Sequence, residues 1–279
     1  MAETPFSQIK TSLSDVLSEN MINILPDKWE KIGDILVVKL SASLEEYKNV
    51  IGEKYAQFLS CKTVLQDKGG IVGTFRVPDV EVIFGDEKTV TVHRENGIRF
   101  KLDPSKVMFS SGNMDERIRM ANISKDDEVV VDLFAGIGYF CIPLAVYRSP
   151  RKVFACEVNP VAFGFLCDNV VLNDVSSFVE PLLGDNRKVA PDNVADRVIM
   201  GFLRDNYSFL GVGLSCLRNR SGFIHFHDLC PNELLPGHPL DKIRAGVEKF
   251  GLKVELQNFV NVKSYAPGVS HVVYDLWIG

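Results

Sequence analysis

The chain has 279 residues, of which 46% are hydrophobic and 24% are charged, and its formal net charge is −5. This composition is typical of a globular protein with one large or two ordinary domains, and it excludes an intrinsically disordered chain. The negative charge argues against nucleic-acid binding through overall charge, although a local basic patch can serve the same purpose.

Neither a membrane nor a metal is predicted from the sequence. No apolar run approaches the roughly 20 residues that a membrane span requires, and residues 1–6 lack the basic and apolar regions of a secretion signal. The six cysteines lie mostly in apolar runs and form no C-x-x-C pair. We therefore expect a cytoplasmic protein without disulfides or a structural zinc site.

The first third of the chain is predicted to form a small domain. Residues 1–28 have the apolar spacing of a short helical lead-in, and residues 29–107 mix strand and helix patterns in the manner of an α+β domain. Gly85-Asp86 predicts a hairpin turn between the last two strands of this region. The predicted elements are strands at Ile32–Leu40, Lys62–Leu65, Val80–Phe84 and Lys88–His93, and a helix at Ser43–Leu59.

A basic window follows at residues 88–119, where seven basic and four acidic side chains give a formal charge of +3. A solvated surface is the plainer explanation of such a run. The functional alternative is a contact with nucleic-acid phosphates. The basic residues are Lys88, Arg94, Arg99, Lys101, Lys106, Arg117 and Arg119.

From Met120 onward, strand and helix patterns alternate as in a parallel sheet built from βαβ units. Asn159-Pro160 is a cap and first-turn pair for a helix that should reach Asn173. The last two strands are joined by a turn too short for a crossover helix, so they should pair antiparallel. Seven strands with only the last reversed form the α/β, Rossmann-like sheet of class I methyltransferases, predicted here over residues 108–279. The strands are expected at Glu128–Leu133, Lys152–Glu157, Val179–Leu183, Arg197–Met200, Gly222–Asp228, Lys253–Val262 and His271–Ile278.

The first of these strands runs into the glycine turn Asp132-Leu-Phe-Ala-Gly-Ile-Gly138. Gly136 and Gly138 permit positive φ and close backbone approach, and open α/β sheets bind ligands at this edge. Cys141 stands where a dinucleotide fingerprint has its third glycine, which argues against an NAD enzyme. Glu157 ends the next strand, where a carboxylate accepts both hydroxyls of a ribose. The pattern favours a nucleoside without phosphates over a purely structural glycine turn.

Six segments together resemble the wybutosine-synthesising aminocarboxypropyltransferases of tRNA over roughly residues 30–279. They are Met108–Asn113, Glu116–Arg119, Asp132–Phe140, Ala155–Glu157, Gly184–Lys188 and Ser264–Pro267. The resemblance implies that S-adenosylmethionine (SAM) donates its aminocarboxypropyl group to carbon 7 of 4-demethylwyosine at position 37, in the anticodon loop of tRNA(Phe).

The resemblance also implies a set of cofactor-binding residues. Ser110 and Arg117 should contact SAM, with Arg117 as a clamp for its carboxylate, and Glu157 should bind its ribose. Asp185 and Asn186 should bind the adenine. The residues of the glycine turn that complete the set are Asp132, Phe134, Gly136 and Gly138.

The related tRNA guanosine-37 N1-methyltransferases are the main alternative. They carry an Asn-Pro-type motif after the fourth strand, whereas this chain reads Met200-Gly-Phe-Leu203, as the transferases do. Arg204-Asp205 departs from both patterns. A non-catalytic SAM-fold protein would have a broken ribose or adenine site, but Glu157 and Asp185 are both present.

His225 and His227 lie on one face of the fifth strand, because alternate strand residues share a face. A proton relay or a contact with the base is the functional interpretation, and a structural pair is the alternative. A metal site would need a third ligand that the sequence does not indicate.

Overall fold

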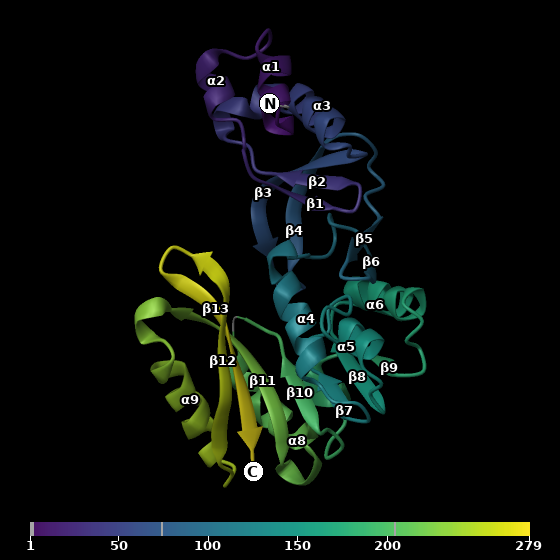
Figure 1. Ribbon diagram of the computed structural model, residues 1–279, viewed down its shortest axis with the longest axis vertical. Coiled ribbons are helices and arrows are strands. Elements are labelled where there is room, and N and C mark those ends of the chain that lie inside the picture. Colours follow the sequence, from purple (N-terminus) through teal and green to yellow (C-terminus); the bar gives the residue numbers. More distant parts are fainter. Residues whose placement is uncertain (1–2, 74, 204) are drawn as a thin grey trace. The chain divides into compact units, whose positions relative to one another are not determined.

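The structure, a computed structural model, describes residues 3–73, 75–203 and 205–279. It divides the chain into two compact units (Figure 1). The first comprises residues up to Arg94 together with Arg99–Ser111, and the second comprises Glu95–Ile98 and Gly112–Gly279. None of the helices in the described parts has the length and apolarity that a membrane span needs.

The first unit is built around a four-stranded sheet of order β1-β2-β3-β4, with β2 and β3 parallel and the other pairs antiparallel. Ile9 and Leu13 of α1 are buried in the same core as Ile51 and Tyr55 of α3. The elements are α1 (Pro5–Leu13), α2 (Glu19–Asn23), β1 (Trp29–Ile32), β2 (Ile35–Val38), η1 (Ala42–Tyr47), α3 (Lys48–Leu59), β3 (Thr63–Val72), β4 (Val77–Phe84), β5 (Thr91–Glu95) and β6 (Ile98–Leu102).

Two predictions for this region are wrong. The expected strand Ile32–Leu40 is interrupted at Gly33, whose φ of +59° turns the chain between β1 and β2. The expected hairpin at Gly85-Asp86 does not form, because β4 belongs to the four-stranded sheet and β5 pairs with β6 in a separate two-stranded sheet. The turn that joins β5 to β6 lies at Asn96 and Gly97, both of which have positive φ.

The second unit contains the predicted seven-stranded sheet, with strand order β12-β13-β11-β10-β7-β8-β9 (Figure 1). β13 is antiparallel to both of its neighbours, and the other described pairs are parallel. The elements are η2 (Ser111–Asn113), α4 (Met114–Ile123), β7 (Val129–Asp132), α5 (Cys141–Tyr147), β8 (Lys152–Glu157), α6 (Pro160–Leu172), β9 (Val179–Leu183), α7 (Asn186–Val189), β10 (Arg197–Met200), η3 (Asn206–Phe209), α8 (Leu210–Cys216), η4 (Arg218–Arg220), β11 (Gly222–Pro231), η5 (Asn232–Leu234), α9 (Gly237–Glu248), β12 (Val254–Ala266) and β13 (Val269–Ile278).

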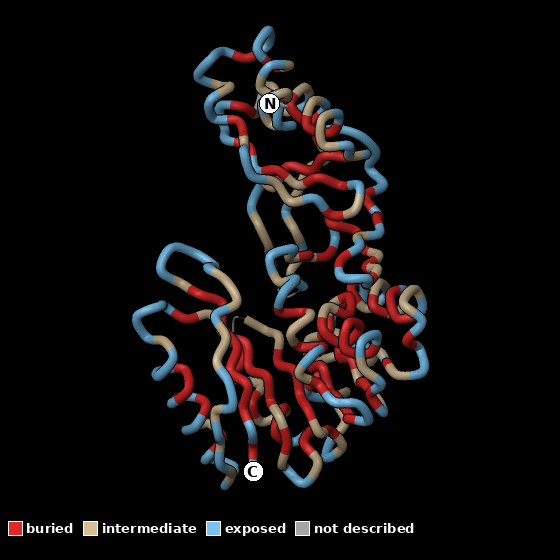
Figure 2. The backbone as a smooth tube through the Cα atoms, in the orientation of Figure 1, coloured by how far each residue is buried: buried red, intermediate tan, exposed pale blue. Residues whose placement is uncertain are grey.

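The central strands of this sheet are covered on both faces. β7 and β10 are buried along their whole length (Figure 2), as expected for apolar β-branched runs in a parallel sheet. On one face, Ile224 and Phe226 of β11 share a core with residues of α8 and α9. His225 and His227 alternate with these two residues and therefore face the opposite side.

Candidate active site

The turn after β7 has the geometry that its glycines predict. Gly136 has φ +60° and Gly138 has φ +101°, a region that side chains disfavour. A Cβ on Gly136 would lie 2.4 Å from the Tyr139 ring, and one on Gly138 would lie 2.2 Å from Ile142. Ala135 N–H donates to Cys156 O over 2.9 Å, which fastens the turn to β8. The turn therefore requires glycine at both positions, and it lies at the carboxyl edge of the sheet.

The Glu157 carboxylate is held by this turn at the end of β8. Its Oε2 accepts the Gly136 N–H over 2.8 Å, and its Oε1 accepts the Asn159 N–H over 2.7 Å. Burial raises the pKa of this carboxyl. A carboxylate oxygen has more than one lone pair, so each oxygen can accept a second hydrogen bond after its backbone donor.

Two buried polar groups beside the turn have an atom without a partner. Asp132 is fully buried, and its Oδ1 accepts the Phe134 N–H over 3.2 Å. Asn186 is also buried, and its amide donates to Leu133 O over 2.9 Å. Oδ2 of Asp132 and Oδ1 of Asn186 accept no hydrogen bond from the described residues. Burial raises the pKa of Asp132 to about 7, so this group can donate or accept near neutral pH.

Asp185 is the N-cap of the short helix α7, and its carboxylate binds the residues that follow it. Its Oδ1 accepts the Arg187 N–H over 3.0 Å as an N-cap, and the Arg187 guanidinium also binds the carboxylate, with Nε 2.9 Å from Oδ1. This ion pair lowers the pKa of Asp185. The capped turn positions Asn186 next to the end of β7.

Three phenylalanines gather where β7 and β10 end. The rings of Phe134 and Phe202 stack with centroids 5.1 Å apart and planes inclined by 18°. Phe209 of η3 meets Phe134 edge-on at 5.0 Å, and the Arg187 guanidinium lies 5.4 Å from the Phe209 ring centroid. All three rings are partly exposed. They form an aromatic wall beside the glycine turn. Arg204 lies outside the described residues, and its neighbour Asp205 is exposed.

Arg117 on α4 is buried, and its guanidinium group is already hydrogen-bonded to a carboxylate. Nη2 donates to Glu95 Oε2 over 2.6 Å, and Nε donates to the other Glu95 oxygen. Both residues belong to the second unit, since Glu95 lies in the β5–β6 turn segment that groups with it. A clamp on the carboxylate of SAM would therefore have to share this guanidinium with Glu95. Ser110 lies in the first unit, just before η2.

The two histidines of β11 belong to different clusters. His225 Nδ1 donates to Asp275 Oδ1 over 2.6 Å, and its Nε2 contacts the Arg197 guanidinium. Burial lowers the pKa of His225, so the ring is neutral between these two charges. The structural interpretation suits His225. His227 instead pairs with His271 of β13, which the sequence did not indicate.

A network of buried charges surrounds His225. Arg197 makes two hydrogen bonds to Glu128, at 2.7 and 3.0 Å. Arg119 makes two to Glu116, at 2.7 and 2.8 Å. Arg119 also donates to Asp275 over 2.7 Å. Burial alone raises the pKa of Asp275, but the hydrogen bonds from His225 and Arg119 hold it well below its usual range. The network joins α4 to β10, β11 and β13.

The basic window divides between interior and surface. Arg117 and Arg119 are engaged in the buried pairs described above. The other five cations of the window lie in the first unit, and we call four of them the basic face, leaving out Lys88. These four are Arg94, Arg99, Lys101 and Lys106. Arg94 and Lys106 are exposed, and Arg99 and Lys101 are partly exposed. Lys106 also pairs with Asp103 at 3.2 Å.

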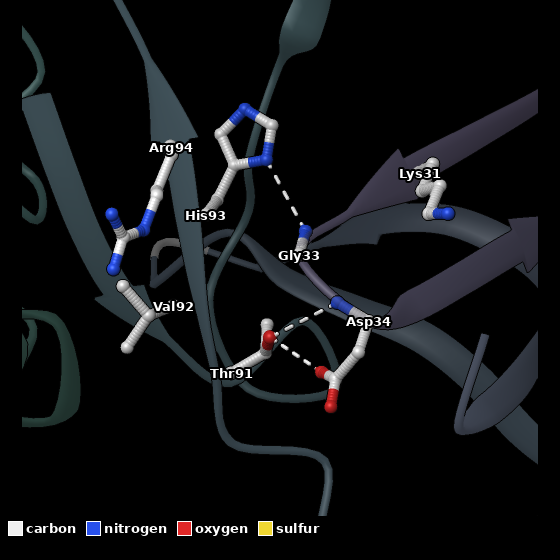
Figure 3. Close-up of a pocket in the computed structure, with 7 residues that line it drawn as sticks. All are labelled: Lys31, Gly33, Asp34, Thr91, Val92, His93 and Arg94. Carbon is white, nitrogen blue, oxygen red and sulfur yellow. Dashed lines mark hydrogen bonds between the residues drawn. The ribbon is translucent and has the colours of Figure 1, made fainter. Parts of the chain in front are cut away.

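A pocket of about 610 Å³ adjoins the basic face where the β1–β2 turn meets β5 (Figure 3). Gly33 N–H donates to His93 Nδ1 over 3.2 Å, so the His93 ring proton lies on Nε2. Thr91 Oγ1 donates to Asp34 over 2.6 Å. Arg94 and Lys31 flank the pocket on opposite sides in this view. The lining residues are Lys31, Gly33, Asp34, Thr91, Val92, His93 and Arg94.

The strand order, the glycine turn and the carboxylate at the end of β8 define a class I SAM-dependent methyltransferase fold. The family described as the TRM5/TYW2 methyltransferase domain matches residues 91–255, and the TYW2 N-terminal domain matches residues 9–89. The chain belongs to this TRM5/TYW2 family.

The chain is similar to individual relatives over nearly its full length. It is 44% identical to the tRNA(Phe) (4-demethylwyosine(37)-C(7)) aminocarboxypropyltransferase of Pyrococcus horikoshii, over 96% of this chain and 95% of that one. It is 36% identical to the tRNA (guanine(37)-N(1))-methyltransferase Trm5b of Pyrococcus abyssi, over 92% of this chain and 76% of that one. The crystal structure of Methanocaldococcus jannaschii TYW2 in complex with AdoMet is 39% identical, with a TM-score of 0.73, covering 90% and 99%.

The residues at the glycine turn fit SAM. Two buried oxygens beside the turn, Oδ2 of Asp132 and Oδ1 of Asn186, accept no hydrogen bond from the described residues. A nucleoside offers hydroxyl and amino donors for such acceptors. Among the described residues, no cluster of three metal-ligating side chains occurs.

Proposed function

We propose that the protein transfers the 3-amino-3-carboxypropyl group of SAM to carbon 7 of 4-demethylwyosine at position 37 of tRNA(Phe). The observation that carries this proposal is the near full-length match to the Pyrococcus horikoshii transferase at 44% identity. The methyltransferase Trm5b matches less closely, at 36% identity, and extends further beyond the chain.

The chain's own groups would hold the cofactor from three sides. Glu157 would accept the ribose hydroxyls through the lone pairs that its backbone donors leave. Asn186 Oδ1 would accept the adenine amino group, and Asp132 would face the polar end of the donor. When bound, SAM supplies a sulfonium whose γ-carbon is open to nucleophilic attack. The protein decides which carbon reacts by the orientation in which it holds the two partners.

The aromatic wall is suited to the base. Phe202 follows β10, at the edge where the glycine turn lies, and its ring stacks on that of Phe134. Stacking of a base on an aromatic side chain contributes roughly 1 to 3 kcal/mol, and a tricyclic base offers a larger face than guanine. The Met200–Leu203 segment presents apolar side chains and glycine there, without the Asn-Pro-type motif of the methylating relatives.

The anticodon arm of tRNA(Phe) would contact the basic face of the first unit. Arg94 and Lys106 are exposed there, and the neighbouring pocket adds the His93 ring with its proton on Nε2. Phosphate contacts fix the position of a nucleic acid without reading its sequence. Selection of tRNA(Phe) would then follow from the tricyclic base itself. We place the enzyme in the cytoplasm with its tRNA substrate.

The direct test is to incubate the protein with SAM and tRNA(Phe) that carries 4-demethylwyosine, and to identify the modified nucleoside by mass. The proposal predicts a product heavier by the aminocarboxypropyl group. A product heavier by one methyl group contradicts it.

A further inference from the structure

The buried side chain of Asn206, at the start of η3, joins the ends of two strands beside the candidate active site. Its amide nitrogen donates to Met200 O over 2.5 Å and to His227 O over 2.9 Å. Met200 is the last residue of β10 and pairs with Phe226, so His227 is the first residue of β11 beyond that pairing. Both carbonyl groups lie where the ladder between β10 and β11 stops. Asn206 therefore supplies the donors that the ladder no longer provides.

The chemistry of the amide explains why asparagine occupies this position. A primary amide has two N–H donors on one nitrogen, so it can satisfy two carbonyl oxygens at once, which a hydroxyl group cannot. Asn206 is 1% exposed, and its Oδ1 has no hydrogen-bond partner among the described residues. An unpaired buried acceptor costs free energy, so the two donated bonds hold the side chain in place against that cost. The opposite orientation of the amide would set Oδ1 against two carbonyl oxygens.

The segment Gly201–Leu203, which directly follows β10, lies against the glycine turn. A Cβ on Gly201 would lie 3.1 Å from the ring of Phe140, just after that turn. The Phe202 ring stacks on Phe134 within the turn, with the two planes inclined by 18°. The Phe202 ring is partly exposed. The end of β10 therefore determines where this ring stands beside the cofactor turn.

The helix η3 contacts the aromatic wall and β11 through two further side chains. Phe209, its last residue, meets the Phe202 ring edge-on, with the centroids 6.0 Å apart. The Tyr207 hydroxyl donates to Asp228 Oδ2 of β11 over 2.5 Å. Of these contacts, only the Asn206 amide reaches the end of β10. Loss of its two bonds would release that strand end, whereas the bond from Tyr207 to β11 would remain.

We propose that Asn206 is a positioning residue for the transfer, an inference that rests on the proposed function. By tying the end of β10 to β11, Asn206 holds Phe202 in the orientation in which the tricyclic base stacks on it. Asn206 itself contacts neither the base nor the cofactor, because its side chain is enclosed. A base held in one stacked position presents carbon 7 to the γ-carbon of SAM in one geometry, and near-attack geometry selects the bond that reacts.

Asn206→Ala tests the proposal, because it removes both donated bonds. We expect kcat/KM for tRNA bearing 4-demethylwyosine to fall roughly 5- to 150-fold, the factor that one stacking contact between a base and an aromatic ring contributes. The Kd for SAM should not change, because the Ala135 N–H fastens the glycine turn to β8 independently of Asn206. Tyr207→Phe is the matched control and should react at the wild-type rate, since it removes a hydrogen bond between η3 and β11 but leaves the end of β10 tied.

A double-mutant cycle with Phe202→Ala shows whether Asn206 acts through that ring. The proposal predicts that Asn206→Ala has its full effect in the wild-type background. In the Phe202→Ala background it should lower kcat/KM by less than about 2-fold, because the contact that Asn206 positions is already absent. An equal fold loss in both backgrounds identifies a purely structural role and overturns the proposal. An Asn206→Ala enzyme with wild-type kcat/KM overturns it as well.

A measurement on the wild-type protein decides the matter if Asn206→Ala does not fold. NMR of protein labelled with nitrogen-15 at asparagine should show slow solvent exchange for both side-chain amide protons of Asn206, as two buried donated bonds require. Exchange as fast as that of an exposed asparagine, such as Asn219, overturns the proposal. A wild-type enzyme that forms S-adenosylhomocysteine contradicts the proposed function instead, and the NMR result still shows whether Asn206 ties the strand ends.

Discussion

Replacing Glu157 by glutamine tests the cofactor site most sharply, because both carboxylate oxygens already accept a backbone N–H, at 2.8 and 2.7 Å. The glutamine side chain has only one acceptor oxygen. Its NH₂ group would therefore face the backbone N–H of Gly136 or Asn159, and two hydrogen-bond donors would oppose each other. The substitution also removes the negative charge that strengthens the hydrogen bonds to the ribose hydroxyls. Hydrogen bonds to a charged group contribute about 1.5 to 3 kcal/mol. The Kd for SAM should therefore rise roughly 10- to 150-fold.

Isothermal titration calorimetry with SAM at pH 8 measures this change, and thermal unfolding shows whether the variant is folded. Glu180→Gln is the control, because Glu180 is exposed on the neighbouring strand β9 and forms a surface ion pair with Lys152. Burial raises the pKa of Glu157, so wild-type affinity should fall as the pH drops through that raised pKa, whereas the Glu157→Gln affinity should not. A folded Glu157→Gln protein with wild-type Kd would refute the assignment of Glu157 to the ribose.

Three further results are expected. Reversing the four charges of the basic face should weaken tRNA binding and reduce its salt dependence, since phosphate contacts release counterions. SAM binding should not change. Unchanged tRNA affinity in filter binding would show that this face is only a solvated surface. The folded-state pKa of Asp132 is about 7, above the unfolded value of about 3.9. Between these two values the folded state binds more protons than the unfolded state, so the free energy of unfolding should decrease as the pH rises from about 4 to about 7. Asp132→Asn should remove that fall in urea titrations, and an identical pH profile would contradict the burial argument. Gly138→Ala should destabilise the protein by more than about 1 kcal/mol in the same titrations, because a Cβ would meet Ile142 at 2.2 Å where φ is +101°; wild-type stability would show that the turn relaxes.

The seven-stranded sheet was predictable because its strands are continuous apolar runs separated by helix signals. The limits of β8, β9 and β10 agree with the predicted ranges, and α6 begins at Pro160 with Asn159 accepting the Val161 N–H, as its cap predicts. In the first unit the apolar run from Ile32 concealed a turn at Gly33, because hydrophobicity alone does not show where a chain reverses.

The candidate site was predictable where its chemistry lies within one short segment. The glycine turn and Glu157 are such cases, since sheet geometry brings the ends of adjacent parallel strands together. Glu95 beside Arg117 and His271 beside His227 were not predictable, because these partners are distant in sequence and depend on how the turn after β5 folds and on the register between β11 and β13. No local pattern encodes either contact.

The by-product of the reaction tests the central claim most directly. The protein is incubated with SAM and either unmodified tRNA(Phe) or tRNA(Phe) bearing 4-demethylwyosine, and the adenosine product is identified by chromatography. Loss of the aminocarboxypropyl group leaves methylthioadenosine, whereas loss of the methyl group leaves S-adenosylhomocysteine. We predict methylthioadenosine with the modified tRNA only. S-adenosylhomocysteine, with N1-methylguanosine appearing in unmodified tRNA, would contradict the account and identify a methyltransferase.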